Sequence, residues 1–185
     1  SWWAAGIFNR NRIRRCAKTC YAQRCITLPK ASKIKMNINW IVKEFDELTA
    51  YELYAIIQLR NEVFVVEQNC VYQDADDRDQ QSAHFCGWIN KTLVAYTRIL
   101  PLGLAYEKYA SIGRVVSSPK YRGTGIGKQL VKNSIEQTFN LYPVNEIKIG
   151  AQLYLKKFYE SFGFKQDGDD YLEDDIPHIP MVLKK

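Results

Sequence analysis

The segment YRGTGIGKQL, residues 121–130, limits the fold more than any other part of the chain. It places glycine at 123, 125 and 127 between Arg122 and Lys128, after a strand pattern and before a helical pattern. Alternate glycines remove side chains, so a phosphate group can approach the backbone N–H groups at the start of a helix, where the dipole favours an anion. The segment therefore predicts an α/β fold with an anion site. A tight strand–helix turn without a ligand is the alternative reading.

Two nucleotide-binding motifs do not fit this glycine spacing. A P-loop needs GxxxxGK followed by Ser or Thr, but Gly123 and Gly127 are one residue too close and Gln129 follows the lysine. A dinucleotide-binding loop needs GxGxxG in a tight strand–turn–helix, whereas residues 117–122 separate this strand from its helix. The spacing therefore disfavours both a nucleotide kinase and a dinucleotide-binding domain.

Apolar periodicity in the rest of the chain indicates both strands and helices. Strand patterns occur at 37–42, 83–89, 93–100, 109–116, 146–150, 164–166 and 179–183. Helical spacing occurs at 48–67, 125–139 and 152–162, and the polar stretch 69–81 predicts a loop. Because the two kinds of element do not alternate strictly, a mixed α/β sheet fits better than a doubly wound one.

Charge divides the chain into two parts. Residues 1–35 contain nine Lys or Arg and no Asp or Glu, whereas residues 36–185 carry 17 basic and 20 acidic side chains. We expect a basic leader at 1–35, either a targeting segment or one that is not native, and one domain at 36–185. The acidic balance of this domain argues against a nucleic-acid partner, and no apolar run suits a membrane span. These features favour a cytoplasmic protein, or an organellar one if the leader is a transit peptide.

The cysteines form no recognisable ligand or disulfide pattern. The chain has five, an odd number, and no CxxC occurs. We therefore expect no metal site and no disulfide framework, which favours a reducing compartment.

Residues on both sides of the glycine segment resemble a known family. RVVSSPKYRGTGIG, residues 114–127, is similar to the fourth strand and pyrophosphate loop of the GNAT acyl-CoA N-acyltransferases, whose loop reads R/Q-x-x-G-x-G/A. FYESFGF, residues 158–164, resembles the LYExxGF signature of that family. LRNEVFVVEQNCVYQDAD, GAQ and EDDIPHIPM look like its ElaA-like branch, and this likeness extends from about residue 37 to the C-terminus. One departure is Asp175, where the branch usually has glycine.

The resemblance implies a fold and a cosubstrate. The fold is a single α/β domain with a mixed, mostly antiparallel sheet of about six to seven strands flanked by about four helices. The cosubstrate is acetyl-CoA, whose pantetheine arm pairs in this family with strand backbone groups that match Val115 and Ser117. Gln152 stands where the family often has a cofactor-contacting Asn. The pyrophosphate loop corresponds to Arg122, Gly123, Thr124, Gly125, Ile126, Gly127 and Lys128.

The resemblance also implies a reaction: transfer of an acetyl group from acetyl-CoA to a primary amine, of a small molecule or a protein, by direct attack. Tyr159 matches the family tyrosine that protonates the departing thiolate; packing in the helix–sheet core is the alternative. Glu67 is a candidate catalytic and substrate-binding residue, or a helix cap. His84 and His178 are candidate substrate contacts, or structural residues. A catalytically silent acyl-CoA-binding or sensor module is the alternative function, and such domains often pair as homodimers.

Charged residues outside these motifs are open to two readings. The acidic run of the 69–81 loop attracts a cationic amine acceptor, or it forms a solvated loop or a helix cap. Arg60 lies on the apolar face of a predicted helix and Arg98 lies in a strand, so we expect both to be structural ion-pair members. The acidic residues concerned are Asp74, Asp76, Asp77 and Asp79.

Overall fold

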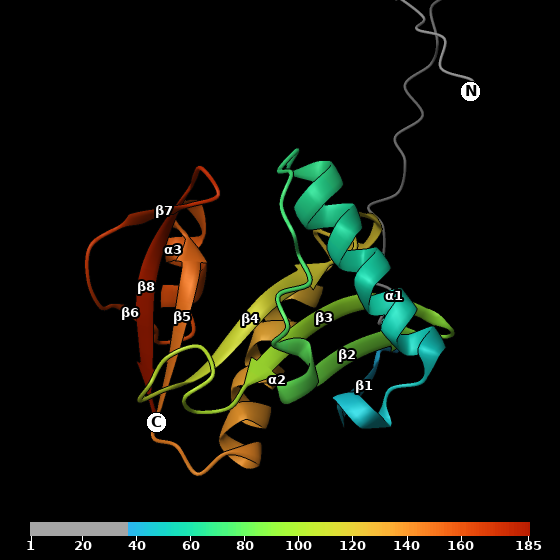
Figure 1. Cartoon of the computed structure of the whole chain (residues 1–185), viewed down its shortest axis with the longest axis horizontal. Coiled ribbons are helices and arrows are strands. Elements are labelled where there is room, and N and C mark those ends of the chain that lie inside the picture. Colours follow the sequence, from blue (N-terminus) through green and yellow to red (C-terminus); the bar gives the residue numbers. More distant parts are fainter. Residues whose placement is uncertain (1–36) are drawn as a thin grey trace, which may run out of the picture. The chain divides into compact units, whose positions relative to one another are not determined.

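The computed structural model describes residues 37–185, so the predicted basic leader at 1–35 lies outside the described residues (Figure 1). One sheet runs through this part of the chain, and it has eight strands there rather than the six to seven expected. Their order is β1-β2-β3-β4-β5-β8-β6, with β7 paired to β8. The strands are β1 (Asn39–Glu44), β2 (Ala83–Ile89), β3 (Thr92–Leu100), β4 (Ala110–Ser117), β5 (Glu146–Gln152), β6 (Lys165–Gln166), β7 (Tyr171–Glu173) and β8 (Ile176–Lys184).

The sheet opens between β4 and β5. These two strands are parallel, whereas the other paired neighbours in residues 37–185 are antiparallel. They pair only at Ala110 with Ile147 and Ser111 with Lys148, and then diverge (Figure 1). A register shift between Tyr96 and Arg98 of β3 accompanies Arg114 of β4 at φ 50°. Such an irregularity bends a strand and increases its twist, so it directs the end of β4 away from β5.

Three α-helices are present in residues 37–185, one fewer than expected. Helix α1 (Ala50–Arg60) starts at a capping box of Thr49 and Glu52 and continues as a π-helical turn, Asn61–Glu67, so the predicted helix at 48–67 is confirmed in two forms. Helix α2 (Ile126–Leu141) follows the glycine segment, and α3 (Lys156–Glu160) is shorter than predicted because Gln152 belongs to β5. No helix of the described part is long and apolar enough to span a membrane.

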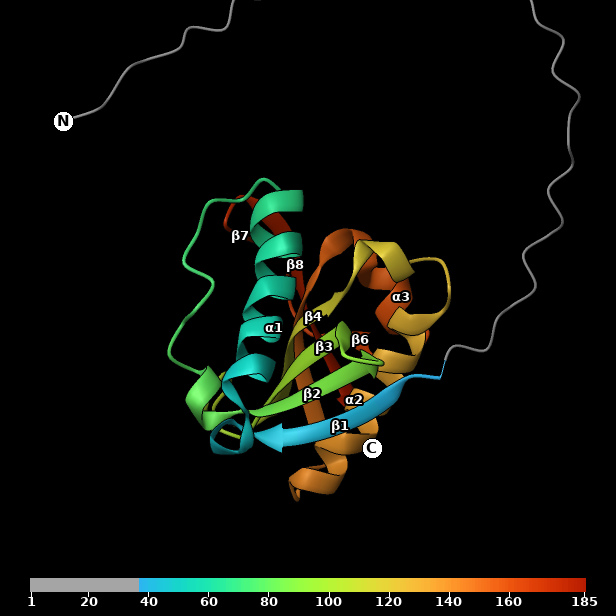
Figure 2. The same cartoon turned by 90° about the vertical axis from the view of Figure 1, so that its right-hand side faces the viewer.

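The helices cover the two faces of the sheet (Figures 1 and 2). On one face Ile56 and Leu59 of α1 pack against Tyr96 of β3. On the other face α2 packs its apolar stripe against β2 and β3, and α2 and α3 together cover β5 and β8. The helical spacing found at 125–139 is confirmed, since Ile126, Leu130 and Ser134 lie one turn apart and are fully or almost fully buried. Because successive side chains of β3 point to opposite faces of the sheet, one strand contributes to the packing on both faces.

Arginines fix the long loop between α1 and β2 to the sheet. Arg60, which is 1% exposed, donates from Nε to Asp74 at 2.7 Å and from Nη1 to Asp79 at 2.8 Å. Arg98 of β3 donates to Asp76 and Asp79, at 2.5 and 2.8 Å. The expectation that Arg60 and Arg98 are structural ion-pair members is therefore confirmed.

The acidic run is correspondingly not a solvated loop. Asp74 is buried and also lies 2.8 Å from Nε of Arg114 on β4. Asp77 is the exposed member of the run. The other three carboxylates neutralise buried arginines, so the reading of the run as a free attractant for a cationic acceptor is wrong for them.

We predict that Asp79→Asn lowers the free energy of unfolding by about 3 kcal/mol, because it leaves Arg60 and Arg98 buried with less compensating charge. Burial alone would raise the pKa of Asp79, but the charges and hydrogen bonds of the two arginines lower it. The stabilisation is therefore present above the usual carboxyl pKa of about 4 and is lost as pH falls toward the lower folded-state value. Urea unfolding at neutral and acid pH measures both effects.

Asp77→Asn is the matched control, because Asp77 is exposed and asparagine also tolerates its φ of 59°. Equal losses of stability in the two variants would contradict the role given to Asp79.

Candidate functional site

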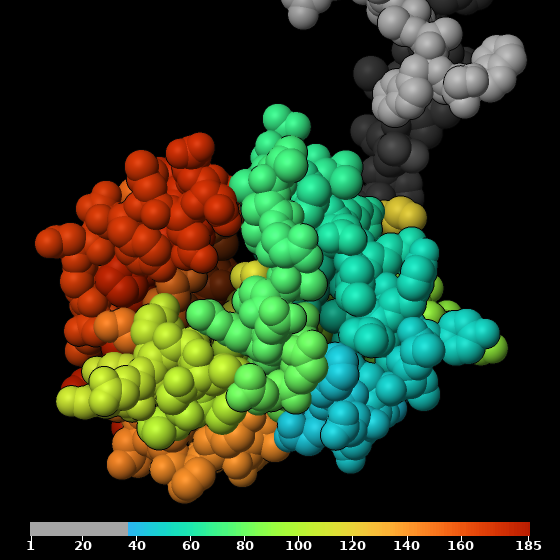
Figure 3. Space-filling model, in the orientation of Figure 1, coloured from blue at the N-terminus to red at the C-terminus, as the bar shows by residue number. Residues whose placement is uncertain are grey.

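A cavity of about 890 Å³ occupies the opening between β4 and β5. Its walls come from the π-helical turn, the ends of β4 and β5, the glycine segment, α3 and the β7–β8 hairpin. Figure 3 shows a hollow between the C-terminal strands, in red, and the segment after α1, in green. The cavity therefore lies where the parallel strand pair separates.

The end of β4 exposes unpaired backbone groups to this cavity. Beyond Ser111 no strand of residues 37–185 pairs with β4 on its β5 side, and Val115, Val116 and Ser117 all line the cavity. Backbone N–H and C=O groups are strong hydrogen-bonding groups that need partners. An extended ligand with amide groups can supply those partners, as a neighbouring strand would.

The glycine segment forms the cavity wall beside α2. Gly125 is the N-cap of α2 at φ 90°, and Gly123 has φ 76°, so both adopt backbone conformations that favour glycine. Gly127 lies one residue inside the helix, lines the cavity, and has no atom within 4 Å of where a Cβ would stand. The first turn of α2 thus presents backbone N–H groups toward open space, which suits an anion.

The other members of the segment have separate roles. The Ile126 side chain is 2% exposed and packs in the α2 core, so only its backbone is available to a ligand. Thr124 donates from its hydroxyl to the Tyr121 carbonyl at 2.6 Å, and Lys128 is exposed on the first turn. Arg122 lines the cavity.

Comparison with known proteins shows to which family the chain belongs. The family model for the acetyltransferase (GNAT) domain matches residues 49–185. The protein ElaA of Escherichia coli is 44% identical over 147 residues, which cover 78% of this chain and 95% of ElaA. The chain belongs to the GNAT acetyltransferase family. The resemblance seen in the glycine segment and in FYESFGF is therefore confirmed.

Solved structures agree with this assignment. The crystal structure of an acyl-CoA N-acyltransferase from Pseudomonas aeruginosa is similar, with a TM-score of 0.76 and 41% identity, covering 80% of this chain and 99% of that one. The crystal structure of Escherichia coli ElaA has a TM-score of 0.75 and 42% identity, covering 80% of this chain and all of that one. Both relatives are matched over nearly their whole length.

Glu67 lies at the rim of the cavity in an ion pair. Its two carboxylate oxygens accept from Arg122 at 2.5 and 2.9 Å, which joins the π-helical turn to the glycine segment. The hydrogen bond and charge of Arg122 lower the pKa of Glu67. A carboxylate held in this way is a weak proton acceptor at neutral pH. We therefore withdraw Glu67 as a candidate base and treat it as the partner of Arg122.

Tyr159 of α3 lines the cavity from within an aromatic cluster. It is 6% exposed and packs edge-on against Phe158 and Phe164, with ring centroids 5.3 and 5.9 Å apart. Its hydroxyl has no hydrogen-bond partner in the described part of the chain. Burial raises the pKa of Tyr159, so the phenol keeps its proton. Tyr159 is thus packed in the core, as the alternative reading expects, and it also lines the cavity.

Gln152 and His178 face each other across the β5–β8 pair. Both line the cavity, and Gln152 also lies 3.4 Å from the side-chain oxygen of Gln68. His178 is half-buried, and its Nδ1 donates to the Ile176 carbonyl at 2.8 Å. The two sequence candidates are thus brought together at the cavity.

His84 lies elsewhere, so its role as a substrate contact is not supported. It is fully buried in β2 and does not line the cavity. Its ring nitrogens lie 2.9 Å from the Tyr96 hydroxyl and 3.0 Å from the Asp79 carbonyl. Burial lowers the pKa of His84, so it remains neutral. His84 therefore has the structural role, as part of the core beneath the arginine network.

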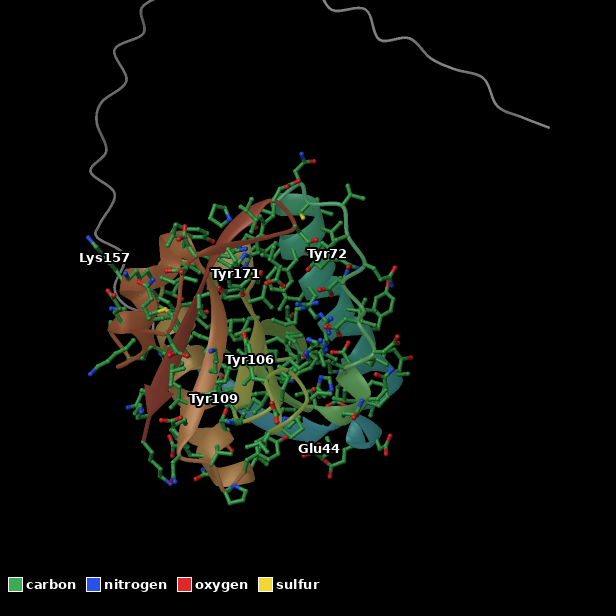
Figure 4. The ribbon with its side chains drawn as sticks, turned by 60° about the vertical axis from the view of Figure 1, so that its left-hand side comes forward. Glu44, Tyr72, Tyr106, Tyr109, Lys157 and Tyr171 are labelled. Atoms are coloured by element: carbon green, nitrogen blue, oxygen red, sulfur yellow. The ribbon has the colours of Figure 1, made fainter. Side chains whose placement is uncertain are left out.

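Sequence reasoning missed three tyrosines that line the cavity. Figure 4 shows Tyr106 from the β3–β4 connection, Tyr171 from β7 and Tyr72 from the loop after α1, and all three line the cavity. A Cβ on Gly150 of β5 would strike the Tyr171 hydroxyl and lie 3.5 Å from that of Tyr106. The glycine of the GAQ segment was the available signal, because it marks a close approach.

Proposed function

We propose that this chain is an acetyl-CoA-dependent N-acetyltransferase that acts on a primary amine. The observation that carries the proposal is the opening of the sheet between β4 and β5, whose cavity is lined by the glycine segment and by Tyr106 and Tyr171. A cavity of this kind has room for a thioester and an amine to meet. Membership of the GNAT family supports the same reaction class.

The pyrophosphate of acetyl-CoA binds at the first turn of α2. Its charge is met by the N–H groups of residues 123–127 and by Arg122, which donates its Nε–H to phosphate while its two terminal nitrogens stay bonded to Glu67. The amides of the pantetheine arm then pair with β4 at Val115 and Ser117, and Gln152 lies on the opposite side of the cavity. This arrangement holds the thioester where the strands separate.

Acyl transfer follows by direct attack. The neutral amine forms a C–N bond to the thioester carbon, the carbonyl electrons move to oxygen, and backbone N–H groups of β4 stabilise the oxyanion. When the resulting tetrahedral intermediate collapses, the C–S bond breaks, and the sulfur leaves with the electron pair of that bond. Tyr159 gives its phenol proton to that thiolate and is reprotonated from solvent, while the new amide nitrogen releases its excess proton to a solvent water. Products are the N-acetyl amine and the free thiol.

We predict that Gly127→Asp raises the dissociation constant for acetyl-CoA roughly tenfold or more, equivalent to about 1.4 kcal/mol. The backbone accepts a side chain there, since φ is not positive and a Cβ meets nothing within 4 Å, but the carboxylate repels the pyrophosphate. Isothermal titration calorimetry measures the affinity. Gln129→Asp is the control, because it adds the same charge to the same helix turn on an exposed residue. Equal affinities in the two variants would place the pyrophosphate elsewhere.

We predict that Tyr159→Phe lowers kcat about 10²-fold with little change in acetyl-CoA affinity, because it removes only the proton donor. Stability should change by less than about 0.5 kcal/mol, since the hydroxyl has no protein partner in residues 37–185. Thiol release from acetyl-CoA is measured against n-butylamine, spermidine, glycinamide and a lysine peptide. Tyr51→Phe, on the exposed side of α1, is the control.

If Tyr159→Phe turned over at the wild-type rate, Tyr159 would not be the proton donor, but the proposed acetyl transfer would still stand. Binding of acetyl-CoA without thiol release by the wild type, for any of these amines, would instead favour the silent acyl-CoA-binding or sensor module.

A further inference from the structure

His178 has one ring nitrogen fixed by the backbone and the other free. Its Nδ1 lies 2.8 Å from the carbonyl oxygen of Ile176, which can only accept a hydrogen bond. In the neutral ring the proton must therefore be on Nδ1, and Nε2 carries a lone pair. The side chain is thus held in the tautomer that can take up a proton at Nε2.

That Nε2 is open to the cavity. His178 lines the cavity, and its Nε2 has no hydrogen-bond partner within residues 37–185. Nε2 of His178 is not among the side-chain atoms of residues 37–185 that are both sealed from solvent and without a hydrogen bond, so it is open to the cavity. A lone pair that faces a cavity without a protein partner is available to a ligand.

The β7–β8 hairpin fixes the plane of the imidazole. Its two-residue turn, Asp174 and Asp175, has φ values of 50° and 61°, as a type I′ turn requires, and it sets the register that places Tyr171 opposite His178. The two rings stack with centroids 5.8 Å apart and planes at 29°. The Tyr171 hydroxyl approaches Gly150 of β5 so closely that a Cβ at this position would strike it, so the phenol end is packed against β5. Tyr171 is therefore a positioning residue for His178.

Other acid–base groups around the cavity are less suited to accept a proton. Glu67 is ion-paired with Arg122, and Asp76 is held by Arg98. Burial raises the pKa of Tyr171 to about 12, so its phenol stays neutral. His84 has both nitrogens engaged and lies off the cavity. Among the sequence candidates, His178 alone combines a free lone pair with a place in the cavity wall.

We infer that Nε2 of His178 takes the proton from the ammonium group of the acceptor before it attacks the thioester. This inference rests on the proposed function. The proton moves from the ammonium nitrogen to Nε2, the N–H electron pair stays on the amine as its nucleophilic lone pair, and His178 later releases the proton to solvent. Tyr159 and His178 then act on different partners: Tyr159 on the departing sulfur and His178 on the incoming nitrogen.

Several charged or titratable groups approach His178 from the elements packed around it. The β7–β8 hairpin contributes Tyr171, Glu173 and Asp174, and the β3–β4 connection contributes Tyr106. From the segment after α1 comes Cys70, whose thiol lies 3.8 Å from the Asp174 carbonyl. On β5 the residue opposite His178 is Gln152, which does not titrate. Glu173→Gln and Cys70→Ser therefore accompany every pH profile, so that an inflection can be assigned to His178.

The first test is the tautomer itself. The chain has two histidines, so ¹⁵N–¹H correlation spectra of the imidazole rings are simple, and His178→Asn identifies the signals of His178. We expect the neutral form to be protonated at Nδ1 and unprotonated at Nε2. A neutral form protonated at Nε2 would overturn the inference without any assay of activity.

The second test is kinetic. In His178→Asn the amide can still donate to the Ile176 carbonyl, so the fold is kept, but no proton acceptor remains at the Nε2 position. We expect kcat/KM at neutral pH to fall about 10²- to 10⁴-fold and the acid-side inflection of its pH profile to disappear, with acetyl-CoA affinity unchanged. Tyr171→Ala should lower kcat but keep the inflection. Tyr171→Phe, which keeps the ring, should stay within about threefold of the wild type.

The outcomes separate this inference from the proposed function. Thiol release by the wild type, together with an unchanged rate and pH profile in His178→Asn, would overturn the role of His178 and leave the reaction intact. If the wild type acetylated no amine of the panel, the proposed acetyltransferase function would be overturned, and so would the role of His178 as its base. Loss of acetyl-CoA binding in His178→Asn would overturn the inference, because it would mean that the ring supports the cosubstrate.

Discussion

The early separation of β4 from β5 is the constraint on which the rest of the site depends. The two strands pair at only two positions, and beyond Ser111 the backbone of β4 borders a cavity instead of a strand. Because buried backbone groups need partners, an edge left open inside a sheet favours an extended ligand that can pair with it. The glycine segment that follows β4 then continues the same wall with N–H groups suited to an anion.

The arginine network helps to hold this opening in place. Arg114 lies in the irregular part of β4, and Arg98 lies on β3 beside it; both pair with carboxylates from the loop after α1. That loop covers one side of the cavity, so the charges that neutralise the buried arginines also position a wall of the site. A buried ion pair is weak evidence for net stability, but the loss of one partner is costly. The network therefore specifies geometry more than it adds stability.

Local patterns predicted much of this molecule. The helix after the glycine segment and the strands at 83–89 and 93–100 follow from short-range spacing, and the structure confirms them. Features that depend on pairing with another strand were not predictable from a segment's own pattern. Strand β7 is three exposed residues that exist as a strand through their pairing with β8, and α3 is shortened because Gln152 pairs with His178. Likewise, nothing in the sequence around His84 and His178 shows that one is sealed in the core and the other faces the cavity.

The measurement that tests the account most directly is a crystal structure of the chain with CoA. We expect the diphosphate oxygens within about 3 Å of the backbone N–H groups of residues 123–127, Arg122 in contact with phosphate while still paired to Glu67, and the pantetheine arm paired with β4 between it and β5. The thiol should then lie near the Tyr159 hydroxyl. CoA bound outside the opening, or bound within it with the glycine segment free of phosphate, would contradict the account.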